Sequence, residues 1–296
     1  MNGIGEQFGR SVDAVLRRPR GALVPLLVDA VVLLVGTALF LSLSGFLIQF
    51  PQGYRLPNFP VAVPHALPTV GDILGPTPAL HELPRQVIVA ALILIALAIP
   101  LLAFAEAGFL GVLRAIYLKP IDPIQEGRHA DAWSRIRESF VATGRKHFGA
   151  FLLLRSIQAA LAVAALFLPI LLPRFGNYGL GVLAVDVLLL WAPYAVIEHE
   201  GNPVRAIRES VALVADHLAT TLVALLFGFL LTGGMAILVS PLSAYLPEWA
   251  PFVAAVLYAP VGTALSLFLY RVYLGFYPEE SLPESAPVPT TVPAAG

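Results

Sequence analysis

The sequence predicts an all-α integral membrane protein: a helical bundle of six transmembrane helices, built as three parallel repeats of an amphipathic helix followed by two spans. Composition is the first observation, because the 296 residues are 58% hydrophobic and only 12% charged. Soluble domains contain about 25% charged residues, so this chain has too few to cover a surface exposed to water. Long continuous apolar runs, and a recurring polar segment in front of them, are the other two observations.

The composition also excludes several classes of function. The net charge is −1, so no overall field favours nucleic acid as a partner. The chain has no cysteine, which removes disulfides, thiol catalysis and cysteine metal sites. The arginines within residues 1–20 precede an apolar run that is longer than the core of a signal peptide, about 7–15 residues. We therefore expect this run to remain in the protein as its first membrane helix.

Six apolar runs are long enough to cross a bilayer as helices, which takes about 17–25 residues. Their apolar residues are continuous, whereas the strands of a membrane barrel would alternate, so helices are favoured. Pro100 is expected to kink the second run. The predicted spans are Ala22–Leu47, Gln86–Ala107, Gly149–Leu172, Tyr178–Ile197, Leu218–Val239 and Phe252–Tyr270.

The distribution of Lys and Arg predicts how these spans are oriented. Most of the 18 basic residues fall on the side that also holds both termini, and cytoplasmic segments carry such an excess. Arg55, Arg85 and Arg174 fall on the other side, and Arg155 lies inside a span. The expected location is the inner (cytoplasmic) cell membrane, in a multi-pass arrangement with both termini in the cytoplasm.

An internal repeat divides the membrane domain. The tetrapeptide Ile-Arg-Glu-Ser occurs at 136–139 and again at 207–210, each time shortly before an apolar run. Arg10-Ser11 is interpreted as a degenerate third copy. Each copy precedes two spans, so all copies enter the membrane in the same orientation. The predicted membrane domain is 1–277, with units of about 1–119, 120–200 and 201–277, a proline-rich outer loop at 51–84 and a disordered cytoplasmic tail at 278–296.

Each repeat begins with a predicted amphipathic helix whose apolar residues recur at helical spacing. Such helices can lie in the headgroup layer with basic side chains toward lipid phosphates, or they can simply pack on the spans that follow. The expected partners are the lipid bilayer and its anionic headgroups, with a protein partner or a second copy of the chain left open. The predicted basic surface comprises Arg17, Arg18, Arg137, Lys146 and Arg208. The apolar faces comprise Ile4, Phe8, Val12, Val15 and Leu16; Trp133, Ile136, Phe140 and Val141; and Val204, Ile207, Val211 and Val214.

Three stretches carry a resemblance to a known group: "GFLGVLRAIYLKP" from Gly108, "AWSRIRESFVATGRKHFGAFLL" from Ala132 and "APYAVIEHEGNPVRAIRESVAL" from Ala192. The pattern resembles a loose group of bacterial and archaeal six-span membrane families, and is similar to the membrane domain of glycerophosphoryl diester phosphodiesterases. The catalytic domain of those enzymes is absent from this sequence. The resemblance therefore implies a membrane module and no particular activity.

Four ionisable residues lie within the predicted spans, where such a residue costs about 2.5–3.5 kcal/mol and usually has a partner. From the rise of an α-helix, about 1.5 Å per residue, Asp29, Glu106 and Arg155 reach similar depths. We expect Arg155 to pair with Asp29 or Glu106, either as an ion pair that locks helices or as a polar site for an anionic headgroup or a proton. Asp186 lies deeper and has no evident partner except Gln158.

The sequence contains no catalytic motif. The six histidines form no ligand cluster, and Glu198-His199-Glu200 is interpreted as polarity where a span leaves the membrane. We therefore expect no metal and no cofactor. The predicted function is a non-enzymatic scaffold or a module that interacts with lipid or a partner. The alternative is a permease-like transporter with a polar path, and a lipid enzyme ranks third.

Overall fold

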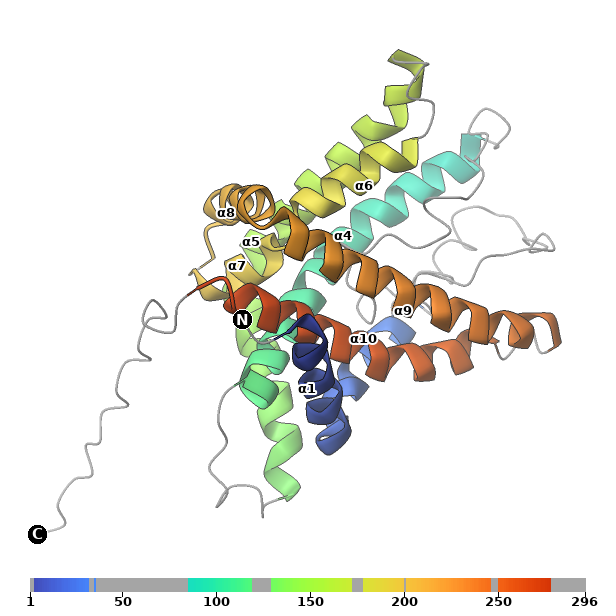
Figure 1. Cartoon of the computed structure of the whole chain (residues 1–296). Coiled ribbons are helices and arrows are strands. Elements are labelled where there is room, and N and C mark those ends of the chain that lie inside the picture. The colour runs from blue at the N-terminus through green and yellow to red at the C-terminus, as the bar shows by residue number, and fades with distance from the viewer. Residues whose placement is uncertain are drawn as a thin grey trace, which may run out of the picture.

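The computed structural model describes residues 3–31, 35, 85–118, 129–171, 178–199, 201–245 and 250–277. All regular secondary structure in these residues is helical, which confirms the all-α fold class (Figure 1). The predicted outer loop at 51–84, the tail at 278–296 and most of the first span lie outside them. Three described helices are long and apolar enough to cross a membrane, and they overlap the second, fifth and sixth predicted spans. They are Ala96–Leu118, Leu218–Val239 and Val253–Leu274. The first of them lies further along the chain than the predicted second span.

Helix α1 (Ile4–Arg17) is the first predicted amphipathic helix, and it packs across α10 (Ala250–Leu274). The ring of Phe8 meets Phe268 of α10 edge to face at a centroid distance of 5.8 Å. It also meets Phe227, on a later helix, edge to face at 4.6 Å. Leu16, expected on the packed face, is 72% exposed instead. The helix turns the adjacent Val15 inward, and one position along an α-helix rotates the side chain by about 100°.

The short 3-10 turn η1 (Pro19–Ala22) joins α1 to helical residues 23–31. Helix α4 (Arg85–Leu113) continues through Pro100 and ends in the π-helical turn η3 (Arg114–Leu118). Tyr117 of η3 lies over Gly21, where an added Cβ would come within 2.3 Å of the tyrosine hydroxyl. Glycine at position 21 therefore permits this close approach, and any larger residue would displace the Tyr117 ring.

Helix α5 (His129–Leu171) runs along α4 and unites the second amphipathic helix and the third predicted span in 43 residues. Two glycines of α4 allow the close contact that small residues permit between membrane helices. Phe140 lies against Gly108 and Thr143 against Gly111, so closely that added Cβ atoms would fall 2.7 and 2.3 Å from them.

The fourth predicted span is divided in two, so the expectation of one continuous helix is wrong. Helix α6 (Tyr178–Leu188) ends, a turn covers 189–191, and α7 (Ala192–Glu198) begins with Pro193 in its first turn. The hydroxyl of Ser210 accepts a hydrogen bond from the backbone N–H of Trp191 at 3.1 Å and donates one to the carbonyl of Leu188 at 2.7 Å. A break inside the bundle is tolerated because this serine satisfies the backbone groups that the break exposes.

Helix α8 (Pro203–Asp216) follows a cap by Asn202, whose side chain accepts from the backbone N–H of Arg205 at 3.1 Å. Figure 1 shows α8 end-on and α9 (Leu218–Tyr245) from the side, so α8 lies across the end of the bundle. The buried face of α8 is Ala206, Ser210 and Val214. Of the predicted valine-rich face, Val214 is buried as expected, whereas Val204 and Val211 are exposed. Small side chains at 206 and 210 let α8 approach α7 closely, and hydrophobicity alone does not reveal this preference.

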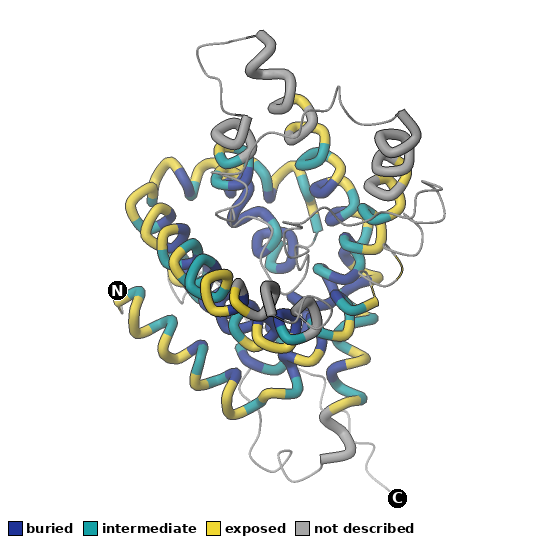
Figure 2. Tube along the Cα trace, turned by 90° about the vertical axis from the view of Figure 1, so that its right-hand side faces the viewer, coloured by how far each residue is buried: buried dark blue, intermediate teal, exposed yellow. Residues whose placement is uncertain are grey.

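The centre of the molecule is filled by large side chains from the second half of the chain. Trp191, Tyr270, Tyr273, Phe151 and Phe268 are fully buried. Buried residues face inward in Figure 2, and exposed residues follow the outer sides of the helices. Several exposed residues on α9 are large and apolar, as expected for a surface in contact with lipid. They include Leu222, Val223, Leu226, Leu230, Ile237 and Leu238.

Candidate functional site

The packing of α4 against α5 brings Glu106 and Arg155 together inside the bundle. The guanidinium of Arg155 binds both carboxylate oxygens of Glu106, with the Nε–Oε2 hydrogen bond at 2.6 Å. Their side chains are 9% and 16% exposed. Of the two partners expected for Arg155, the structure therefore shows Glu106. A bidentate pair of this kind fixes both position and orientation.

The ionic contact continues into a chain of hydrogen bonds. Arg155 also donates to the side-chain oxygen of Gln158, one turn further along α5, and the Gln158 amide donates to Asp186 of α6 at 2.7 Å. An amide suits this position because it accepts from a cation on one side and donates to an anion on the other. Glu106, Arg155, Gln158 and Asp186 thus form one cluster that connects α4, α5 and α6.

Asp29, the fourth intramembrane charge of the sequence analysis, is buried in the helical residues 23–31 with 1% exposure, and it makes a polar interaction there. The nitrogens of Arg155 are occupied by Glu106 and Gln158. Glu106, Arg155 and Asp186 are therefore linked through hydrogen bonds, and Asp29 occupies a buried position on a different segment.

A second polar cluster lies where α4 ends and α7 ends. Glu198 accepts hydrogen bonds from Arg114 at 2.8 Å and from the hydroxyl of Tyr270 at 2.5 Å. Its side chain is 10% exposed, whereas that of Arg114 is 41% exposed. The carboxylate thus connects η3 and α10 to the end of α7, and the guanidinium of Arg114 remains partly exposed to solvent.

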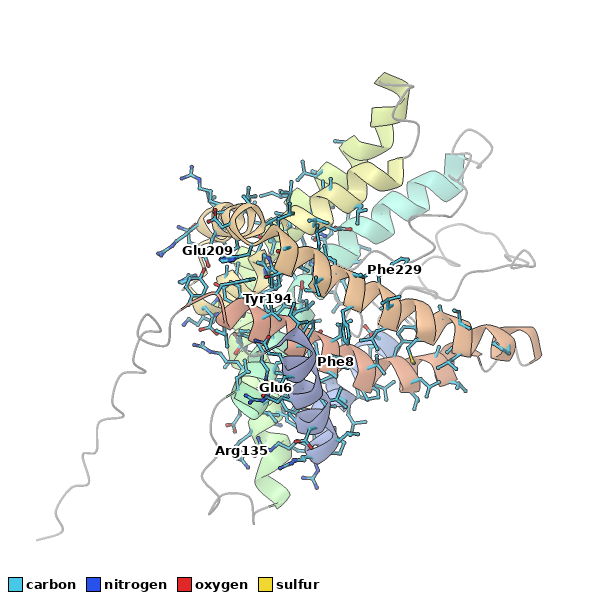
Figure 3. All side chains as sticks on the ribbon, viewed as in Figure 1. Glu6, Phe8, Arg135, Tyr194, Glu209 and Phe229 are labelled. Atoms are coloured by element: carbon cyan, nitrogen blue, oxygen red, sulfur yellow. The ribbon has the colours of Figure 1, made fainter. Side chains whose placement is uncertain are left out.

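Glu209 of α8 is the centre of a third cluster, at the end of the bundle shown in Figure 3. One carboxylate oxygen, Oε1, contacts the hydroxyls of Tyr273 and Tyr277 and the Nε2 atom of His199, with distances of 2.6 Å to Tyr273 and 3.0 Å to His199. Burial and the hydrogen bond to Glu209 raise the pKa of Tyr277 to about 12. The hydroxyl of Tyr277 therefore stays protonated at neutral pH, and both hydroxyls donate to Glu209.

These two clusters were not predicted from the sequence. Glu198 and His199 were expected at a membrane exit, in water, but both side chains bind residues of the bundle. A signal was present, because Tyr270, Tyr273 and Tyr277 recur at spacings of three and four and so share one helix face. A face of tyrosines that ends a membrane helix requires acceptors, since buried hydroxyls are hydrogen-bonded.

His147 of α5 is a further buried polar group, with 3% exposure. Its Nδ1 atom has no hydrogen-bond partner among the described residues and lies close to Gly201, which has a φ of +82°. Burial, helped by the nearby charges of Lys146 and Arg114, lowers the pKa of His147 below its usual range. The imidazole is therefore neutral at pH 7.

The predicted basic surface residues have two different environments. Arg17 forms an exposed ion pair with Asp13, and Arg18 donates to the carbonyl of Ile116 at 2.6 Å. The other three are exposed to solvent: Arg137, Lys146 and Arg208.

These clusters join helices that lie far apart in the sequence. Among the described residues, no group of three or more His, Cys, Asp or Glu side chains is placed to hold a metal ion. No protein-family model, curated protein or solved structure matches the chain. Fold and clusters thus define a class: an all-helical protein with helices long and apolar enough to span a membrane, whose buried charges connect neighbouring helices.

Proposed function

We propose that the protein is a six-span scaffold of the inner cell membrane, without enzymatic activity, that interacts with lipid or with a partner. Its other three spans would be supplied by residues 22–47, the apolar half of α5, and α6 together with α7. The three parallel units then begin with α1, the first half of α5 and α8, and both termini are cytoplasmic. The resemblance to six-span membrane modules supports the same proposal.

One observation carries the proposal: the ionisable groups inside the bundle bind one another. Arg155 neutralises Glu106, Gln158 holds Asp186, and Glu198 and Glu209 are bound by residues of other helices. A catalytic acid or base must face its substrate with the proton it transfers. Groups that hold helices together in this way stabilise an arrangement of helices, which is the task of a scaffold.

The alternative is a permease-like transporter with a polar path through the bundle. The broken α6–α7 segment beside Asp186 favours it, because transporters bind substrates and ions at the open ends of discontinuous helices. Here Ser210 occupies both the Trp191 N–H and the Leu188 carbonyl, so these two groups are already satisfied. The break therefore supports the scaffold better than the transport path.

The test compares Arg155→Leu with the double variant Arg155→Leu/Glu106→Leu. The single variant leaves a buried carboxylate without its cation, which costs about 3–5 kcal/mol, whereas a double apolar replacement of a buried pair is often close to neutral. Thermal unfolding in mild detergent should show a large loss for the single variant and recovery in the double variant.

Native mass spectrometry of the same samples tests the interaction. A scaffold keeps its co-purifying lipid or protein in the stable double variant, since the ion pair only locks helices. A double variant that folds but loses a bound small solute would favour the polar path. If Arg155→Leu is as stable as the wild-type chain, the ion pair does not hold the helices together. If the wild-type chain is a monomer without bound lipid or protein, the proposal of an interacting module is wrong.

A further inference from the structure

The outward side of α8 combines exposed apolar and basic residues. Val204 is 51% exposed and Val211 is 40% exposed, although valine side chains are usually buried in a helix that packs on a bundle. Arg205 and Arg208 are exposed on the same outward side, and neither forms an ion pair with a described residue. The exposed valines would be unfavourable in water, and the exposed arginines would be unfavourable in hydrocarbon.

The opposite side fixes which way this surface points. Ala206 and Ser210 are completely buried, and Val214 is 5% exposed. Ser210 is hydrogen-bonded to the break between α6 and α7, so α8 cannot rotate without losing both of those bonds. The valines and arginines therefore stay directed away from the bundle.

The surface continues into the apolar exterior of α9. Leu218 and Leu222, at the start of that helix, are 51% and 50% exposed. Helix α9 includes one of the described segments that are long and apolar enough to span a membrane, and α8 lies across its end (Figure 1). The outward side of α8 is thus placed at the level where a bilayer changes from hydrocarbon to headgroups.

An open groove on α8 lies between the two arginines and is lined by Asn202, Val204, Arg205, Arg208, Glu209 and Ala212. Glu209 does not cancel their charge fully, because its single negative charge faces the two positive charges of Arg205 and Arg208. Its Oε1 atom is already bound by Tyr273, Tyr277 and His199. Asp216, the other acidic residue of α8, lies in its last turn, away from the groove. The groove is therefore complementary in charge to an anion.

We propose that this side of α8 binds anionic phospholipid: the phosphate lies between Arg205 and Arg208, and Val204 and Val211 contact the upper acyl chains. The proposal rests on the membrane location proposed above and identifies the partner of the scaffold at this surface. Arginines with apolar neighbours suit such a layer, because long basic side chains reach headgroups while the apolar residues enter the acyl boundary. Continuity with the exposed leucines of α9 favours lipid over a soluble protein, which would have to cover only the end of that apolar belt.

The full chain in mild detergent is titrated with phosphatidylglycerol or phosphatidylcholine, and bound lipid is counted by native mass spectrometry. We expect preferential binding of phosphatidylglycerol. The variant R205Q/R208Q should bind it roughly 30-fold more weakly, from about 1 kcal/mol for each basic residue near an anionic surface and tenfold for each 1.4 kcal/mol. R10Q is the matched control, because Arg10 is also exposed but is paired with Glu6, and should leave binding unchanged.

Two further measurements locate the site and do not depend on a variant. Hydrogen exchange of the wild-type chain in nanodiscs should slow in α8 when phosphatidylglycerol replaces phosphatidylcholine. Raising salt from 50 to 500 mM should weaken binding of phosphatidylglycerol, because salt screens exposed charges. Equal binding of the two lipids, or equal loss in R205Q/R208Q and R10Q, would overturn the proposal.

The failures of the two proposals are distinguishable. If R205Q/R208Q loses a co-purifying protein instead of lipid, α8 is a protein-docking surface and the lipid proposal is wrong, while the scaffold proposal stands. If alkaline carbonate releases the wild-type chain from membranes, the membrane scaffold itself is wrong.

Discussion

The two Ile-Arg-Glu-Ser tetrapeptides are identical in sequence and differ in what their side chains do. In α5, Ile136 is 4% exposed and belongs to the core, while Glu138 is exposed and Ser139 is half-buried. In α8 the roles are reversed. Ser210 is completely buried, Glu209 binds three side chains, and Ile207 is only partly buried.

The difference follows from how each helix is connected. The first tetrapeptide lies inside a continuous 43-residue helix, so its rotation is set by the contact of that helix with α4. The second lies in a 14-residue helix between the Asn202 cap and a break at His217, so it can rotate to suit its own neighbours. Local sequence therefore specifies a helix in both places, and tertiary packing decides which side of it is buried.

Among the residues of the two tetrapeptides, the glutamates should show the largest difference in their contribution to stability. Glu209→Ala removes the acceptor of two tyrosine hydroxyls and of His199, and a buried donor left unsatisfied costs about 1–3 kcal/mol, so we expect a total loss of about 3 kcal/mol. Glu138→Ala, the matched substitution in α5, should change stability by no more than about 0.5 kcal/mol, as for most surface changes. Thermal unfolding in mild detergent measures both. Equal losses would show that Glu209 does not hold its partners together.

For the isoleucines, the larger loss of stability is expected in α5 and the smaller one in α8. Ile136→Ala deletes buried atoms from the core and should cost about 2 kcal/mol, at the lower end of values for large-to-small changes. Ile207→Ala, on a partly buried position, should cost less than half as much. The unfolding midpoints of the two variants in one detergent give the comparison directly. A larger loss at position 207 would mean that α8 is rotated relative to the structure.

These two pairs also indicate how much of the fold could be predicted. The long apolar runs of α4, α9 and α10 could be located because span length and continuity follow directly from bilayer thickness. The amphipathic helices could be located as well, from their spacing. The buried side of α1 could be predicted for the most part, because Phe8 and Val15 pack inward as expected. That of α8 could not, because small residues such as Ala206 and Ser210 are buried for close approach and hydrogen bonding, not for hydrophobicity.

The candidate site was predictable to a similar extent. Arg155 and Glu106 stood out because a charge within an apolar run needs a partner. Glu198 and Glu209 did not, because they stand at polar boundaries where water is the expected partner. Only the packing of α10 against these segments brings its tyrosines to them, and contacts between residues so far apart in sequence are not encoded in any local pattern.

The two serines should differ less in their contribution to stability than the glutamates and isoleucines do. Ser210→Ala removes the hydroxyl that satisfies the Trp191 N–H and the Leu188 carbonyl, and should cost about 1–2 kcal/mol. Ser139→Ala should be nearly neutral, since alanine is the better helix former. Hydrogen exchange adds a local measurement, because Ser210→Ala should speed exchange around the α6–α7 break. Unchanged exchange there would contradict the role assigned to this hydroxyl.

The smallest effect on stability at neutral pH is expected for His147 and His217, the histidines that follow the two tetrapeptides. His147 is buried, and its pKa in the folded protein is lowered by burial and by the charges of Lys146 and Arg114. The unfolded chain therefore takes up this proton more readily than the folded protein does. The resulting stability is fully present above the ordinary histidine pKa, near 6.5, and is lost as the pH falls through that value toward the lower pKa of the folded state.

Unfolding midpoints between pH 7.5 and 5 should consequently fall for the wild-type chain and fall less for His147→Leu. His217→Gln is the matched control on the other copy, where the imidazole is stacked on Phe276 at a centroid distance of 4.6 Å. It leaves His147, Lys146 and Arg114 in place, so the acid-side slope due to His147 should persist in it. If His147→Leu keeps the full wild-type slope, another group is responsible, and the resemblance between the two copies does not extend to their histidines.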